Sequence, residues 1–133
     1  MEDLNMQAKI LVIDDERDFL ELMKSHLELE GYQVVSAIDG EDGINKARSE
    51  NPDLVICDIK MPNKTGHEVL KELREDKKHW IPFIMLSALT DFDNIRQAYD
   101  GDSDFYVAKP VQLELLSKNI KTLLNLAKSR TGE

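Results

Sequence analysis

The stretch Lys9-Ile-Leu-Val-Ile-Asp-Asp15 joins a continuous apolar run to two adjacent acids. Apolar side chains at every position are typical of a strand that is covered on both faces, as in a parallel sheet between two layers of helices. A buried helix segment is the competing interpretation, but the run is too short for one. Asp14 and Asp15 then mark the point where the strand stops.

The same pattern returns along the chain, because short apolar runs alternate with longer segments of helical period. The predicted strands span residues 9–13, 32–37, 54–57, 83–86 and 105–108, and the predicted helices span residues 17–30, 41–50, 66–76, 93–99 and 112–129. Consecutive strand–helix units predict an open, doubly wound α/β domain. Right-handed crossovers would place the helices on both faces of a parallel sheet.

Polar residues stand where successive runs end, namely Asp14, Asp15, Asp58, Ser87 and Lys109. The carboxyl ends of parallel strands meet at one edge of the sheet, where ligands of such folds bind, so we expect these side chains to converge. Each also has a plain structural interpretation, because acids cap helices and the other residues suit turns and solvated chain ends. Their joint occurrence at matching strand ends favours a site.

This set of side chains suits phosphoryl transfer. Two carboxylates ~4 Å apart repel by about 4 kcal/mol at an effective dielectric constant of roughly 20, so three acids require a cation. Mg2+ prefers one or two carboxylates together with waters and a phosphate oxygen. Ser87 and Lys109 offer a hydroxyl and a positive charge to phosphate oxygens, and positioning with charge neutralisation supplies most of the catalysis. One aspartate can then act as nucleophile and form an aspartyl phosphate.

Composition narrows the function classes. The net charge of −9 argues against direct binding of nucleic acid or an anionic membrane by this domain. The single cysteine, Cys57, cannot form an intrachain disulfide, and the sequence has neither a signal peptide nor a membrane-spanning apolar stretch, so we expect a cytoplasmic protein. We divide the chain into an N-terminal extension (1–8), one folded domain (9–129) and a C-terminal tail (130–133).

Four stretches form a specific set of motifs: Ile10-Leu-Val-Ile-Asp-Asp15, Asp53-Leu-Val-Ile-Cys-Asp-Ile-Lys-Met-Pro62 with Gly66, Ile81-Pro-Phe-Ile-Met-Leu-Ser-Ala88, and Tyr106-Val-Ala-Lys-Pro110. In these stretches the chain resembles the receiver domains of two-component response regulators, including the chemotaxis type. The resemblance implies a flavodoxin-like five-stranded parallel sheet in the order 2-1-3-4-5. It also implies a phosphorylation-gated signalling switch that is a stoichiometric phosphoacceptor rather than an enzyme.

The resemblance assigns the acidic residues unequal roles. Asp58 is similar to the phosphoacceptor, which takes its phosphoryl group from a sensor histidine kinase or phosphotransfer protein. Asp15 corresponds to a direct Mg2+ ligand, and Asp14 to an acid that acts largely through metal-bound water. The backbone carbonyl of Lys60 corresponds to a further metal ligand.

The resemblance also assigns the residues that sense the phosphoryl group. Ser87 and Lys109 correspond to the pair that grips it, and Tyr106 to an aromatic switch that turns inward when the hydroxyl residue moves. Pro110 follows a peptide bond that is usually cis in this family. The implied output is a changed contact with a protein partner, or self-association, through the fourth helix, fifth strand and fifth helix.

Four interpretations stay open. The chain is a receiver domain that works alone, since few residues follow the last helix, or a receiver taken from a longer regulator with a DNA-binding or enzymatic effector. An aspartate-nucleophile phosphatase would need a second acid two residues after Asp58, where Lys60 stands. A flavin-binding module would need a phosphate-cradling loop after the first strand, where acids stand.

The chain departs from the family pattern before the fifth strand and beside the acceptor. Asp102-Ser103 replaces a common Gly-Ala pair, and Asp tolerates a left-handed backbone better than most residues. Lys60 and Leu89 occupy positions that tune the lifetime of the aspartyl phosphate in this family. Neither carries a carboxylate or amide that could orient an attacking water.

We therefore predict slow self-dephosphorylation, and we expect Lys60→Glu to shorten the half-life of the phosphorylated form by supplying an oxygen that can orient water. Loss of phosphate with time, followed by intact mass, measures it. A native half-life of seconds that is unchanged in Lys60→Glu would contradict the role given to this position.

Overall fold

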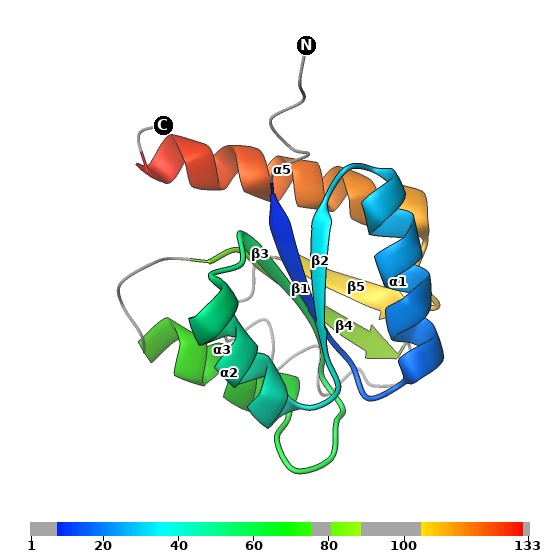
Figure 1. Cartoon of the computed structure of the whole chain (residues 1–133), viewed down its shortest axis with the longest axis vertical. Helices are drawn as coiled ribbons and strands as arrows, with labels where there is room; N and C mark the ends of the chain where they lie inside the picture. The colour runs from blue at the N-terminus through cyan, green and yellow to red at the C-terminus, as the bar shows by residue number, and fades with distance from the viewer. Residues whose placement is uncertain (1–7, 76–80, 89–104, 132–133) are drawn as a thin grey trace.

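A parallel β-sheet runs between two layers of helices in the computed structural model, which describes residues 8–75, 81–88 and 105–131 (Figure 1). The strands are β1 (Lys9–Ile13), β2 (Gln33–Ala37), β3 (Leu54–Asp58), β4 (Phe83–Ala88) and β5 (Phe105–Lys109). Their order across the sheet is β2-β1-β3-β4-β5, and every pairing is parallel. The predicted strand order and sheet type are confirmed.

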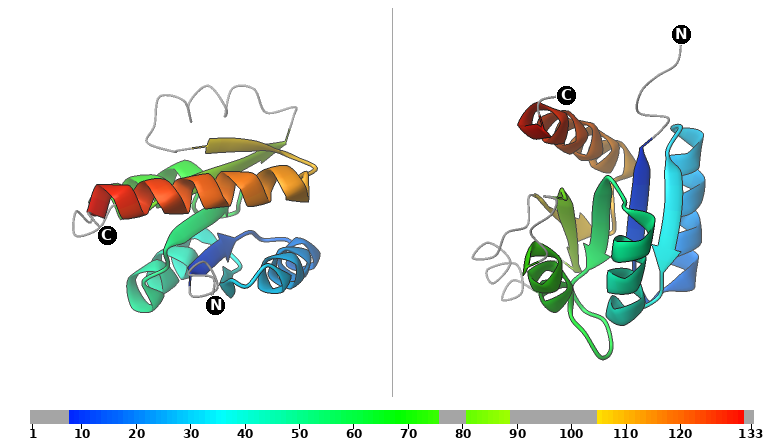
Figure 2. Two further views of the ribbon diagram at one scale, coloured as in Figure 1. Left: turned by 90° about the horizontal axis from the view of Figure 1, so that it is seen from above. Right: turned by 60° about the vertical axis from the view of Figure 1, so that its left-hand side comes forward.

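The described helices lie on both faces of the sheet, as predicted. They are α1 (Arg17–Leu29), α2 (Gly40–Glu50), α3 (Gly66–Glu75) and α5 (Leu113–Thr131). Side chains of α1 and α5 pack into one hydrophobic core, and side chains of α2 and α3 pack into a second core on the opposite face. Figure 2 shows these layers from two further sides.

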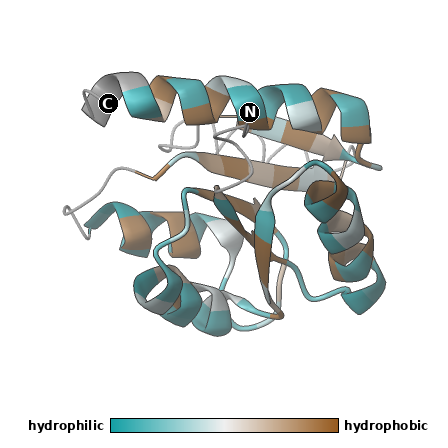
Figure 3. Ribbon diagram, turned by 45° about the horizontal axis from the view of Figure 1, so that its top comes forward, coloured by the Kyte–Doolittle hydropathy of each residue, from teal (hydrophilic) through white to brown (hydrophobic). Residues whose placement is uncertain are grey.

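The continuous apolar run of β1 is explained by these two cores. Ile10 and Val12 belong to the core beneath α1 and α5, whereas Leu11 and Ile13 belong to the core beneath α2 and α3. Because successive side chains of a strand point to opposite faces, a strand that serves two cores must be apolar at every position. Figure 3 shows this contrast, since the strands are mainly hydrophobic and the helices alternate between hydrophobic and hydrophilic residues.

Local capping sets where two helices begin. The carboxylate of Asp39 accepts a hydrogen bond from the Asp42 N–H (2.8 Å) at the start of α2. Thr65 and Glu68 form a reciprocal capping box at the start of α3, in which each backbone N–H donates to the other side chain. None of the helices within the described ranges is long and apolar enough to cross a membrane.

Three strands, β3, β4 and β5, extend further toward their carboxyl ends than the sequence predicts. β3 ends at Asp58, β4 includes Ser87 and β5 ends at Lys109, so these polar residues belong to their strands rather than follow them. The parallel ladder continues through them, with Ser87 opposite Ala108. Hydrophobicity was the signal for a strand, so the predicted ends stopped at the last apolar residue.

Several expectations lie outside the described residues. They concern the predicted helix at residues 93–99 with its part of the output face, Leu89, Asp102-Ser103, most of the N-terminal extension and the end of the C-terminal tail. The Lys109–Pro110 peptide bond is described, and it is cis, as the resemblance implied.

Gly66, the first residue of α3, lies against the backbone of the predicted acceptor. A Cβ atom at this position would meet the carbonyl oxygen of Asp58 at 2.6 Å and the sulfur of Met85 at 2.8 Å. The Gly66 N–H also donates to the carbonyl oxygen of Ile59 (2.8 Å). The backbone therefore cannot move away from Asp58 without losing this hydrogen bond.

We expect Gly66→Ala to lower the free energy of unfolding by about 1–3 kcal/mol, because the added methyl group overpacks this contact. Urea unfolding measures the change. Ser49→Ala, on the exposed side of α2, is the matched control and should change the free energy of unfolding by less than about 0.5 kcal/mol. Equal stability of Gly66→Ala and the native protein would show that the contact relaxes freely.

Candidate functional site

Three carboxylates gather at the carboxyl edge of the sheet. Asp14 and Asp15 follow β1, Asp58 ends β3, and these strands are neighbours. One carboxylate oxygen from each acid lies within 4.8 Å of those of the other two. Asp14 and Asp58 are buried, whereas Asp15 is exposed. The convergence predicted for the acids is thus present.

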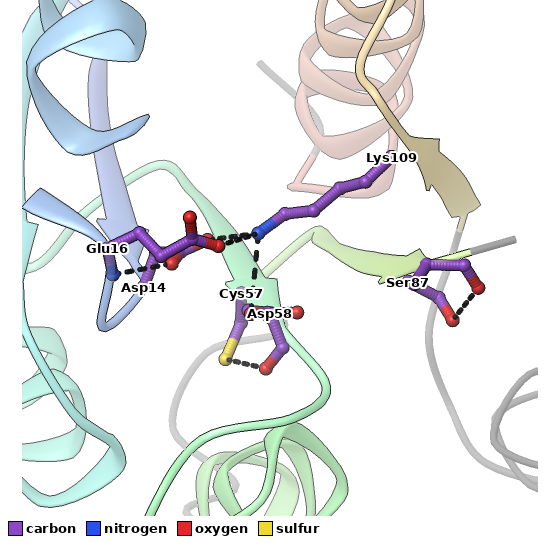
Figure 4. A network of polar contacts seen from close by, with 7 residues as sticks. Asp14, Glu16, Cys57, Asp58, Ser87 and Lys109 are labelled. Atoms are coloured by element: carbon purple, nitrogen blue, oxygen red, sulfur yellow. Dashed lines mark hydrogen bonds and ion pairs between the residues drawn. The ribbon is translucent and has the colours of Figure 1, made fainter. Parts of the chain in front are cut away.

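Lys109 brings one positive charge into this cluster from the end of β5 (Figure 4). Its Nζ atom lies 2.7 Å from Asp14 Oδ2 and 3.4 Å from Asp58 Oδ2. A third carboxylate oxygen, Oε1 of Glu16, lies 3.6 Å away. The long side chain reaches past the end of β4 to the acids of β1 and β3.

The side chain of Asp14 binds Lys109 of β5 and is not the N-cap of α1. Its Oδ1 atom accepts the backbone N–H of Glu16 (2.9 Å), while Oδ2 accepts from Lys109. The N-cap residue of α1 is Glu16, whose side chain makes no capping hydrogen bond. The plain interpretation of this acidic run as a helix cap therefore does not describe Asp14.

Burial controls the protonation of the two inner acids. It raises the pKa of Asp58 to about 6, with the charges of Asp14 and Asp15 adding to the effect and that of Lys109 opposing it. Burial also raises the pKa of Asp14, against its hydrogen bond from Lys109. Although burial lowers the pKa of Lys109, its contacts with Asp14 and Asp58 raise it above its ordinary value. One ammonium group therefore does not offset the cost of the buried negative charge.

The donor set fits a hard divalent cation. Carboxylate oxygens are the ligands that such cations prefer, and the exposed Asp15 opens the cluster to solvent. A second positive charge would also relieve the repulsion among the acids. The acidic cluster could therefore hold a metal ion, as expected from the sequence.

Ser87 lies at the same edge of the sheet, beside the ion-pair network, whereas Tyr106 is the second residue of β5 and lies nearer the amino end of that strand. Ser87 is buried, and its hydroxyl donates to the carbonyl oxygen of Ala88 (3.2 Å), to one side of the Lys109 contacts (Figure 4). Tyr106 is half-buried and packs against the core beneath α2 and α3. The structure thus brings four of the five predicted strand-end residues into contact range and holds Ser87 apart from them.

Cys57, Glu16 and Lys60 lie around the acidic cluster and Lys109. Cys57 is fully buried in β3, and its thiol donates to the carbonyl oxygen of Asp58 (3.3 Å). Glu16, which contacts Lys109, was not predicted as a site residue. The sequence did carry a signal, because Glu16 is the third acid in the run that begins at Asp14. Lys60 is exposed immediately beyond Ile59.

The model of the response regulator receiver domain family matches residues 10–121. The chain belongs to this family. The acids after β1, the acid that ends β3 and the lysine that ends β5 are therefore the strand-end residues of a receiver domain.

Curated relatives of this receiver domain include response regulator RR06 of Streptococcus pneumoniae serotype 2, which is 44% identical over 115 residues. That alignment covers 86% of this chain and 52% of the relative. The alkaline phosphatase synthesis transcriptional regulatory protein PhoP of Bacillus subtilis is 38% identical over 120 residues, covering 90% of this chain and 49% of the relative. This receiver domain thus spans about half the length of the curated relatives it matches.

Solved structures show the same fold. A response regulator receiver domain protein from Clostridium thermocellum is 35% identical, with a TM-score of 0.83. The superposition covers 92% of this chain and 98% of the other. A CheY-like receiver domain protein from Methanospirillum hungatei is 29% identical, with a TM-score of 0.85.

We expect the metal-free receiver domain to lose stability as the pH rises through the range between the unfolded and folded pKa values of Asp58, 3.8 and about 6. The folded state holds this proton more tightly than the unfolded state, so stability is greatest below the range and is lost above it. Asp58→Asn removes the charge and should be about 2–3 kcal/mol more stable than the native protein near pH ~7.5 in EDTA, with a smaller difference near pH ~5.

Urea unfolding at the two pH values measures both differences. Asp18→Asn, which changes an exposed acid of α1, is the matched control and should change stability equally little at both. If Asp58→Asn has the same stability as the native protein at both pH values, burial does not raise the pKa of this carboxyl group.

Proposed function

We propose that this receiver domain is a signalling switch that accepts a phosphoryl group on Asp58. The observation that carries the proposal is the place of this carboxylate: it is buried, it lies beside two further acids, and it lies 3.4 Å from the ammonium group of Lys109. The donor is a phosphohistidine of a sensor kinase or phosphotransfer protein, as family membership suggests.

In the transfer, a carboxylate oxygen of Asp58 attacks the phosphorus atom. An O–P bond forms while the N–P bond of the phosphohistidine breaks, and the imidazole leaves with the electron pair of that bond. Lys109 donates hydrogen bonds to the oxygens of the transferred group and holds it in line with the carboxylate. The chain supplies positioning and charge, and the donor supplies the reactive bond.

The residues that would hold Mg2+ are Asp15 and Asp58 through their carboxylates, Asp14 through water, and Lys60 through its backbone carbonyl. When bound, Mg2+ neutralises the acids and the phosphoryl oxygens, which would otherwise repel each other. Support for this ion comes from the oxygen-only donor set and from the raised pKa of both buried acids.

The switch part of the proposal rests on Ser87 and Tyr106. The hydroxyl of Ser87 donates to the Ala88 carbonyl in the present structure, so it must turn to reach a phosphoryl group on Asp58. We infer that this turn leaves room for the Tyr106 ring and favours one of two states of the output face, which includes β5 and α5. A ligand can shift such states only by its differential affinity for them.

Longer relatives whose sequences match this receiver domain suggest the output. Several relatives are named as transcriptional regulators, and the chain spans about half of their length. We therefore infer an effector outside this chain, with DNA binding as the leading class and protein contact or self-association as the alternative. A phosphatase finds less support, because the exposed Lys60 stands where an acid would protonate the leaving group.

We expect the intact mass to rise by one phosphoryl group when the protein is mixed with Mg2+ and a small phosphodonor such as acetyl phosphate. Asp58→Asn should abolish the increase, because the attacking oxygen is replaced by an amide. EDTA should reduce it strongly, because the acids then repel the donor.

Asp53→Asn provides a matched control. This acid lies at the opposite edge of the sheet, where it accepts the Lys9 N–H (2.7 Å), and an amide oxygen can keep that bond. The variant should be modified like the native protein. Modification of Asp58→Asn at the native rate would place the acceptor elsewhere and overturn the proposal.

A further inference from the structure

Lys109 contacts an aromatic ring as well as the acids. Its Nζ atom lies 4.5 Å from the centroid of the Phe19 ring, on the first turn of α1. At this distance the negative face of an aromatic ring attracts a cation. The ammonium group therefore contacts an aromatic face as well as the acids.

The position of Phe19 follows from the stripe that anchors α1. Leu20, Met23 and Leu27 are the buried residues of this helix, and Phe19 lies at the border of their stripe. Its ring is half-buried and packs against the same core. Because α1 begins just after Asp14 and Asp15, this border position brings the ring to the edge of the sheet where Lys109 ends.

The ring can hold the charge without using a hydrogen-bond donor. An ammonium group has three N–H donors on a flexible four-carbon stem. Asp14 accepts at 2.7 Å, and the contact with Asp58 is longer, at 3.4 Å. These two acids accept two of the three donors, and Glu16 Oε1 lies 3.6 Å from the same nitrogen atom. Attraction to a ring face occupies no donor, so it leaves the third one available for a phosphoryl oxygen.

We propose that Phe19 is a positioning residue of the acceptor site, whose ring face holds the Lys109 ammonium group beside Asp58 so that it can bind the phosphoryl group. This inference deepens the proposed function and rests on it. Phe19 does not touch the reacting atoms and acts through Lys109. Its electrostatic character, and not only its volume, sets how tightly the site holds a phosphoryl group.

The test replaces Phe19 with phenylalanines that carry one, two or three ring fluorines, because fluorine weakens the attraction of the ring face for a cation while nearly preserving its shape. The probe is beryllium trifluoride with Mg2+, a tetrahedral mimic of a phosphoryl group on an aspartate. We expect its affinity to fall stepwise with each fluorine, by about threefold to tenfold over the series.

Two further variants separate charge attraction from packing. Phe19→Leu keeps an apolar side chain but removes the ring, and it should lose at least as much affinity as the trifluorinated residue. The same fluorinated series at Phe105 is the matched control, because this residue is also half-buried against the same core but lies at the far end of β5 from Lys109. Its affinity should stay constant.

The order of the Lys109 ε-methylene group, measured by NMR relaxation, gives a second measurement that needs no phosphoryl mimic. It should fall across the Phe19 series. Constant affinity and constant order across that series would overturn the inference while leaving the proposed function intact. If the native protein does not bind the mimic at all, the proposed function fails, and the order of Lys109 alone decides whether the ring holds it.

Discussion

Two buried carboxylates, Asp14 and Asp58, share a single ammonium group at the carboxyl edge of the sheet, and the rest of the structure maintains this contact. The acids come from neighbouring strands, while Lys109 comes from the edge strand on the far side of β4. Burial opposes ionisation of both acids. An isolated loop could not hold such charges together, because repulsion would separate them; a packed parallel sheet can, since each acid is fixed by its strand.

The distances from Lys109 to the two buried acids are unequal, so the two carboxylates are stabilised to different extents. The ammonium group lies closer to Asp14 than to Asp58, so the predicted acceptor is the less satisfied of the two acids. Ser87 is likewise turned toward the backbone of its neighbour. Addition of a phosphoryl group at Asp58 would offer new acceptor oxygens to both residues. The structure thus has groups that can respond to modification without a large rearrangement of the sheet.

Sequence reasoning located the sheet because its signals are local. The continuous apolar runs and the acids that follow them are read directly from neighbouring residues, so β1 was predicted at its observed bounds and the acidic cluster was anticipated. Strand order came from family resemblance, because apolar runs carry no information about which strands pair.

Contacts that depend on side-chain direction could not be predicted in this way. The hydroxyl of Ser87 donates to the Ala88 carbonyl oxygen, and the carboxylate of Glu16 lies 3.6 Å from the ammonium group of Lys109, on a distant strand. The contact between the Phe19 ring and the same ammonium group also joins residues that are far apart in the sequence. Each of these requires the packed three-dimensional arrangement, which no periodicity encodes.

The separation of the two cores by the sheet has a consequence for how this domain can change. Among the residues that the structure describes, the core beneath α1 and α5 shares no buried residue with the core beneath α2 and α3. Because the sheet separates these two sets of side chains, substitutions on opposite faces should have nearly independent effects on stability. One face can then acquire a new partner through gradual repacking while the other keeps the domain folded. Because the side chains of each strand contribute to both cores, the strands should tolerate fewer substitutions than the helices.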